Sequence, residues 1–253
     1  MAEIIAIANQ KGGIGKTTTA VALSQAFRNM GKRTLYCDLD PQANGTDNFR
    51  AKVDGVSTMY DLLLHGDTDC IQHTEMGDII AGDPLLKDAG KHLTGVSATY
   101  KLREGLEAIS PNYDFIILDT PPALGVLLHN ALTAATRVVV PLTLDRFGLQ
   151  GLVQLSDTIQ EVRKYANSSI VVDGMLIVKF NDRTNLSKGI LDSLPEYAAQ
   201  FNTKIYNSRI RESIRAREAQ ATQHSIYEWA PDSTTALDYV ELAKEILGGI
   251  ANG

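Results

Sequence analysis

The chain has 253 residues, is 44% hydrophobic and carries a formal net charge of −6. This length and hydrophobic content suffice for one substantial α/β core, and the acidic balance by itself argues against nucleic-acid binding. No apolar run approaches the length of a membrane span, and no basic region precedes the first short apolar stretch, so we expect a soluble protein. No linker, repeat or low-complexity tract marks a boundary, so residues 1–253 are predicted to form one domain.

Strand patterns alternate with helix patterns along the chain. In chain order we predict a strand at 3–8, a helix at 16–30, a strand at 33–38, a helix at 57–64, a strand at 79–81, a helix at 97–109, strands at 115–119 and 137–141, a helix at 149–165, a strand at 170–178, and helices at 186–201 and 233–247. This alternation predicts an α/β fold in which a mostly parallel sheet is covered by helices on both faces. Ligands of such sheets bind at the carboxyl ends of the strands.

The cysteines and histidines give no sign of a metal site. Cys37 and Cys70 are far apart and form no C-x-x-C pair, which indicates neither a disulfide framework nor a zinc site and fits a reducing cytoplasm. Five histidines are scattered without metal-ligand spacing: His65, His73, His92, His129 and His224.

A glycine-rich run joins the first predicted strand to the first helix. It reads Lys11, Gly12, Gly13, Ile14, Gly15, Lys16, Thr17 and Thr18. Glycines let successive backbone N–H groups converge on an anion, and the helix N-terminus adds its positive dipole end. The run therefore predicts a polyphosphate site in which Lys16 reaches the β- and γ-phosphates and the Thr17 hydroxyl holds Mg²⁺. The alternative is a glycine-rich connection with no ligand.

Carboxylates follow two of the predicted strands. Asp38 and Asp40 end the second strand, where strand alternation puts them on the same side, and Asp119 ends the strand at 115–119. Taken singly, each could be an ordinary turn residue. Together with the glycine-rich run, they predict that Asp119 meets Mg²⁺ directly or through a water.

The narrower pattern K-G-G-x-G-K-T-[ST], met from Lys11 to Thr18, resembles that of the deviant Walker A ATPases, which include the ParA and MinD proteins. The resemblance runs over nearly the whole chain and implies a P-loop NTPase fold with a doubly wound, twisted sheet. It implies that ATP and Mg²⁺ are the cofactors and that ATP drives formation of a homodimer. It also implies that Lys11 reaches across to the phosphates bound by the other subunit.

The resemblance assigns roles to the carboxylates as well. It implies that Asp40 orients the attacking water, that Asp38 sits near the metal and that Asp119 is the Walker B carboxylate. Lys11, Lys16 and Asp40 are then the catalytic residues. No strong general base is evident, so we expect slow hydrolysis of ATP. Slow hydrolysis suits a protein that times a process better than it suits a motor.

Two segments are candidates for the adenine side of the site. Asn181 follows the strand at 170–178, and its amide offers a donor and an acceptor that match adenine N6 and N7. It could also be a turn-forming asparagine. Residues 208–211 resemble the second adenine-side loop of the family, which makes Arg211 a candidate nucleotide-binding residue.

Local charge departs from the acidic average. Between Lys179 and Arg217, eight basic residues stand against four acidic ones, a net of +4. Such a surface could bind DNA phosphates without reading bases, or it could be a solvated face with ordinary salt bridges. ParA relatives that lack an added helix-turn-helix domain bind DNA non-specifically, which favours DNA. The candidate contacts are Arg183, Lys188, Arg215 and Arg217.

The C-terminal pattern argues against a membrane anchor. MinD relatives end in a basic amphipathic helix, whereas the polar positions between Tyr239 and Gly249 are largely acidic. We expect the apolar face of this helix to pack on the core.

Taken together, the resemblance favours a ParA-type ATPase, closest to the small Soj-type proteins, in plasmid or chromosome partition. It would be associated with the nucleoid and regulated by a ParB-like centromere-binding protein. Two alternatives stay open: a related ATPase that positions a protein cargo, and a metabolic P-loop enzyme, for example one that forms amides with ATP.

Overall fold

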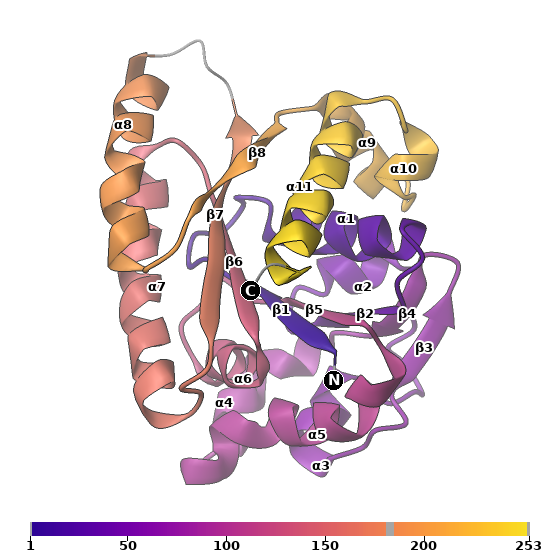
Figure 1. The fold of residues 1–253 in the computed structure, drawn as a ribbon. Helices are drawn as coiled ribbons and strands as arrows, with labels where there is room; N and C mark the ends of the chain where they lie inside the picture. The colour runs from indigo at the N-terminus through magenta and orange to yellow at the C-terminus, as the bar shows by residue number, and fades with distance from the viewer. Residues whose placement is uncertain (1, 181–184, 252–253) are drawn as a thin grey trace.

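The computed structural model describes residues 2–180 and 185–251, and an eight-stranded sheet runs through them (Figure 1). The strands are β1 (Glu3–Ile7), β2 (Thr34–Asp38), β3 (Ile71–Thr74), β4 (Gly77–Ile80), β5 (Phe115–Asp119), β6 (Arg137–Leu142), β7 (Val171–Phe180) and β8 (Ile205–Arg211). Their order in the sheet is β3-β4-β2-β5-β1-β6-β7-β8, and every pair is parallel except β3 with β4.

Helices cover both faces of the sheet (Figure 1). They are α1 (Lys16–Asn29), α2 (Asn44–Asn48), α3 (Met59–His65), α4 (Ala89–His92), α5 (Lys101–Ile109), α6 (Val126–Ala134), α7 (Arg146–Tyr165), α8 (Asn185–Gln200), α9 (Ile214–Ala221), α10 (Ile226–Trp229) and α11 (Thr234–Ala251), with 3₁₀ helices at Pro84–Asp88, Val96–Tyr100 and Ser110–Asn112. Among the described helices, none combines the length and apolarity needed to cross a membrane.

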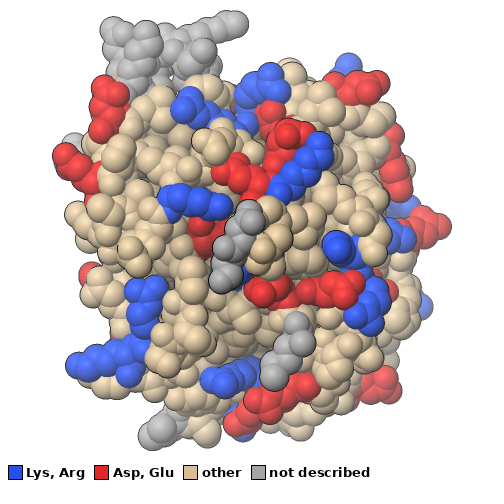
Figure 2. Space-filling model, in the orientation of Figure 1, with Lys and Arg blue, Asp and Glu red and all other residues tan. Residues whose placement is uncertain are grey.

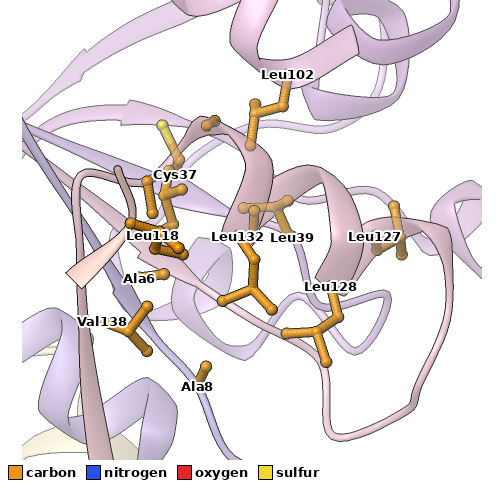
Figure 3. Packing of buried hydrophobic residues seen from close by; sticks show 14 of the residues in the cluster. Ala6, Ala8, Cys37, Leu39, Leu102, Leu118, Leu127, Leu128, Leu132 and Val138 are labelled. Atoms are coloured by element: carbon orange, nitrogen blue, oxygen red, sulfur yellow. The ribbon is translucent and has the colours of Figure 1, made fainter. Parts of the chain in front are cut away.

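Strand alternation divides the core into two layers, one on each face of the sheet. On one face, Ala6, Leu118 and Val138 lie near Leu128 and Leu132 of α6 (Figure 3). The opposite layer is formed by alternate strand residues with α1 and α11. Each fully buried Leu or Ile contributes about 1.5–3 kcal/mol to folding, so these layers fix the sheet against its helices.

Most predicted elements are present, and the predicted strand at 115–119 coincides with β5. The apolar face of the C-terminal helix packs on the core as expected, because Tyr239, Leu242 and Ile246 of α11 are buried. The predicted helix at 97–109 is divided into a 3₁₀ helix and α5. The elements that were not predicted include the strands β3 and β8 and the helices α2, α4, α6, α9 and α10.

One prediction about the adenine side was wrong. Residues 208–211 are not a loop, because they form the second half of β8. This strand lies at the edge of the sheet, and its burial pattern alternates. An edge strand that is exposed on alternate positions can carry serine and arginine, so its polar sequence resembles a loop.

The parallel register brings three strand ends together. Asp119 of β5 is aligned with Ile7 of β1 on one side and with Asp38 of β2 on the other. The chain after β1 and the two carboxylates therefore meet at one edge of the sheet, where ligands of α/β sheets bind.

We predict that Gly174→Ala destabilises the protein by about 1–3 kcal/mol, because overpacking of a filled core forces side chains out of their rotamers. A Cβ on Gly174 would lie 2.5 Å from the ring of Tyr206. Tyr206 is itself buried, and its hydroxyl donates a hydrogen bond to the carboxylate of Asp173. Gly189→Ala is the matched control, since its Cβ meets nothing within 4 Å, and it should stabilise α8 by about 0.5–1 kcal/mol. Chemical denaturation measures both, and equal effects of the two substitutions would contradict the packing argument.

Candidate nucleotide-binding site

A cavity of about 570 Å³ lies at the carboxyl edge of the sheet, beside the glycine-rich run. Its wall is formed by residues 12–18, by part of α2, by the ends of β7 and β8, and by α9 and α11. The volume lies in the range of small-molecule sites, and the wall combines apolar surface with a few charged groups.

The glycine-rich run has the conformation that an anion-binding loop requires. Gly13 and Gly15 have φ angles of +71° and +96°, in the left-handed region that favours glycine. Helix α1 begins at Lys16, and no side chain caps its first turn. The N-terminal N–H groups of α1 are therefore available to an anion, whose charge the helix dipole also favours.

Lys16 is nearly buried, and its Nζ donates a hydrogen bond to the backbone carbonyl of Lys11 at 3.1 Å. Burial lowers the pKa of Lys16, and the nearby carboxylates of Asp119 and Asp40 oppose that shift. The ammonium group is thus held against the loop, in a poorly solvated position where its attraction for a phosphate is strong.

Asp119 is fully buried at the end of β5. The Tyr36 hydroxyl donates to its Oδ2 at 2.8 Å, whereas its Oδ1 is buried without a hydrogen-bond partner. Burial first, and then the charge of Asp38, raise the pKa of Asp119 to about 8, and the neighbouring hydroxyls of Thr17 and Tyr36 oppose the shift. A buried carboxylate oxygen without a partner is a position where a ligand is expected.

Asp38 and Asp40 differ in their surroundings, although they are two residues apart. Asp38 is fully buried, and its Oδ2 accepts hydrogen bonds from the backbone N–H and the hydroxyl of Thr46, both at 2.8 Å. Burial raises the pKa of Asp38 to about 6, against these hydrogen bonds. Asp40 lies on the cavity wall, and its Oδ1 accepts from the Gln42 N–H at 3.0 Å. Asp40 therefore faces the ligand space, while Asp38 fixes α2.

The donor set fits Mg²⁺ better than a transition metal. Among the described residues, no group of three or more His, Cys, Asp or Glu side chains could hold a metal ion. What the site offers is the Thr17 hydroxyl on the cavity wall and the unpartnered Oδ1 of Asp119. Mg²⁺ prefers oxygen ligands and is usually held by one or two protein groups together with phosphates and waters.

Lys11 is placed apart from the cavity wall. Its Nζ forms an ion pair with Asp145 at 2.7 Å and a hydrogen bond with Thr143 at 3.0 Å, just beyond the end of β6. Its backbone N–H donates to Oδ1 of the buried Asn9, whose Nδ2 donates to the carbonyl of Pro141. No sequence pattern indicated that Asp145 would contact this lysine.

On the adenine side, Asn181 lies outside the described residues. Arg211 is on the cavity wall, at the end of β8, and its guanidinium is held by Asp238 at 2.6 and 3.0 Å.

The four candidate DNA contacts are not brought onto one described surface. Arg183 lies outside the described residues, and Lys188 falls in the first turns of α8. Arg215 and Arg217 lie on α9, in ion pairs with Glu218 and Glu212, and Arg217 also lines the cavity. On the face that Figure 2 shows, basic and acidic side chains are interspersed.

Helix α9 contributes to the site, and the sequence did not indicate this contribution. Gln220 of α9 donates to the Thr18 hydroxyl at 2.8 Å, and Gln223, just past α9, donates to Asp47 of α2 at 2.8 Å. Nothing in the spacing of these glutamines relates them to a loop some 200 residues earlier, so only the structure could find them.

The chain is similar to several known proteins. A family model described as an AAA domain matches residues 2–172. The chain is 38% identical to the sporulation initiation inhibitor protein Soj of Bacillus subtilis, with 100% of both chains covered. It is 36% identical to the chromosome-partitioning ATPase Soj of Thermus thermophilus, covering 97% of this chain and 96% of that protein. Among solved structures, a cobyrinic acid a,c-diamide synthase from Mycobacterium smegmatis with bound ADP and magnesium is 28% identical, with a TM-score of 0.85 and coverage of 100% and 97%.

We predict that the nucleotide-free protein loses stability as the pH rises from 5 to 9. The pKa values of Asp38 and Asp119 are raised by folding, from 3.8 to about 6 and about 8. The contribution of these two carboxyl groups to stability is therefore fully present below about pH 4, and it is lost as the pH rises through their pKa values in the folded protein. Asp119→Asn removes the larger part of this pH-dependent loss of stability. The melting temperature of the variant, relative to that of the wild type, should therefore rise as the pH increases from 5 to 9. Asp54→Asn, at an exposed turn, is the control, and parallel curves for Asp119→Asn and the wild type would refute the prediction.

Proposed function

The chain belongs to the ParA/Soj family of chromosome-partitioning ATPases, and on that premise we propose that ATP in this cavity switches a dimer between DNA-bound and free states. The chain is accordingly an ATPase that uses ATP and Mg²⁺. The observation that carries the proposal is the meeting of the phosphate loop with Asp40 and Asp119 at one edge of the sheet. We further propose that residues 1–253 act as one ATPase domain around the single sheet.

We assign the hydrolytic roles from the position of each group. Mg²⁺, when bound, would supply positive charge to the phosphate chain. Lys16 supplies a second positive charge from within the loop, and Thr17 and Asp119 provide the oxygen ligands or their water-mediated equivalents. Asp40 is on the cavity wall, where its carboxylate can orient a water for attack on the γ-phosphate. Since a carboxylate that only orients water is a weak base, turnover should be slow.

Lys11 explains why a second subunit is proposed. In the single chain its ammonium group is bound by Asp145 and Thr143, so it does not line the cavity of its own subunit. The Lys11 and Asp145 side chains are 25% and 38% exposed, and an ion pair of that exposure contributes only about 0–1 kcal/mol. Lys11 can therefore leave Asp145 at small cost when the phosphates of a partner subunit offer a stronger charge.

We propose that the ATP-bound dimer holds DNA through phosphate contacts, in the cytoplasm and on the nucleoid. Arg183, Lys188, Arg215 and Arg217 stay the candidate contacts. Arg215 and Arg217 are more than half exposed, so their carboxylate partners could be exchanged for DNA phosphates. A ParB-like centromere-binding protein would stimulate hydrolysis and release, consistent with the partition role in the name of the Thermus thermophilus relative.

A metabolic role is the second candidate, because the cobyrinic acid a,c-diamide synthase shares the fold at 28% identity. The 36% identity to the chromosome-partitioning ATPase Soj of Thermus thermophilus, over 97% of this chain, favours partition over this alternative. An amide-forming enzyme would show ATPase activity stimulated by a small-molecule acid and no response to DNA. A positioning ATPase with a protein cargo would keep the same site and the same dimer.

The test of the proposal is retention of an Asp40→Ala variant on random-sequence DNA. This variant should bind ATP without hydrolysing it, because the water-orienting carboxylate is gone. We expect retention with ATP and none with ADP, and a loss of at least tenfold in affinity between low and moderate salt, since phosphate contacts release counterions.

Two further variants sharpen that measurement. Lys11→Ala in the Asp40→Ala background should abolish both dimerisation and DNA retention. Lys244→Ala removes an exposed lysine that pairs with Glu241 on α11 and should leave both unchanged. An ATP-bound dimer, established by sedimentation, that ignores DNA would overturn the DNA-carrier proposal.

A further inference from the structure

Lys179 stands in an unusual backbone conformation on the wall of the cavity. It is the penultimate residue of β7 and lines the cavity together with the phosphate loop. Its φ angle is +51°, in the left-handed region that residues with a side chain rarely adopt. Holding a lysine there costs about 1–2 kcal/mol, and strained residues of this kind gather at binding and active sites.

A break in strand pairing produces this conformation. The register between β7 and β8 shifts between Ile177 and Phe180, so Lys179 sits at a bulge. Val178 is buried in one core layer, and Phe180 packs against the other. Because both neighbours are anchored, the bulge redirects Lys179 alone, which is how bulges near active sites re-aim a side chain.

The redirected side chain contacts the phosphate loop. The Nζ of Lys179 donates a hydrogen bond to the carbonyl of Gly13 at 2.7 Å. Lys16 has an equivalent contact, because its Nζ donates to the carbonyl of Lys11. Two ammonium groups therefore rest on neutral carbonyls of the same loop, and a phosphate oxygen would be a stronger partner for either of them.

Charge pairing separates these two lysines from the other basic residues on the cavity wall. Arg211 is paired with Asp238, and Arg217 with Glu212. Among the residues that the structure describes, no carboxylate lies within ion-pair distance of Lys179 or Lys16. A bound polyphosphate would thus meet Lys179 without having to displace a described acidic side chain.

We propose that Lys179 is a further nucleotide-binding residue, whose ammonium group moves from the Gly13 carbonyl to an oxygen of the phosphate chain of ATP or ADP. The inference rests on the proposed nucleotide site and adds a contact from β7 to those from the loop. It also explains the strained backbone, because the bulge directs the Lys179 ammonium group toward the phosphate loop before the nucleotide binds.

The test is the affinity of Lys179→Asn for ATP and ADP, measured by calorimetry with Mg²⁺. Asparagine tolerates the left-handed conformation, so the bulge should persist, but its amide is too short to reach the loop. We expect the Kd for both nucleotides to rise about tenfold at low salt and the difference to shrink at high salt, because the lost contact is between charges. The melting temperature of the nucleotide-free variant should be equal to that of the wild type or higher.

Control variants separate the possible failures. Lys179→Arg keeps the charge and should retain most of the affinity, and Lys52→Asn, which removes an exposed lysine outside the cavity wall, should have no effect. A wild-type protein that binds no ATP would refute the nucleotide site itself. Wild-type affinity in Lys179→Asn would overturn only the present inference. So would a loss that is independent of salt, or a lower melting temperature with unchanged Kd, since the latter indicates a structural brace.

Discussion

The parallel pairing of β1, β2 and β5 is the constraint on which the site depends. It aligns Ile7, Asp119 and Asp38 across three neighbouring strands, so the loop after β1 and the carboxylates of the other two strands must meet. The pairing is held by two buried core layers, and a slip of one residue would turn every strand side chain to the wrong face. The position of the reactive groups is therefore secured by hydrophobic packing far from the chemistry.

The electrostatics of the site follow from the same burial. Asp38 and Asp119 are removed from water, which raises their pKa values, and Lys16 is nearly buried, which lowers its pKa. Three ionisable groups in poor solvent are costly to charge without partners. Thr46 offsets part of this cost for Asp38, whereas Oδ1 of Asp119 has no partner. Nucleotide and metal binding are thus expected to stabilise the fold as well as to begin the reaction.

Elements with a strong pattern were predicted well, and those with a mixed pattern were not. The strand at 115–119 has five buried residues and was found with its limits. The strands β3 and β8 were missed because both lie at sheet edges, where exposed positions carry polar residues. Helix α6 is buried on most sides, so its apolar sequence lacks the helical period. The predicted single helix at 97–109 begins as 3₁₀, a boundary detail that propensity does not resolve.

The glycine-rich run could be recognised as a candidate phosphate loop from the amino-acid sequence alone, because its glycines, its lysine and the helix that follows are adjacent in the chain. The sequence also indicated the carboxylates, since strand ends can be recognised locally. The groups that those residues contact could be identified only from the folded chain. Lys11 with Asp145, Lys179 with Gly13, and Gln220 with Thr18 join residues more than 130 positions apart. Such contacts depend on strand order and on a bulge in β7, and a single sequence carries no local signal for either.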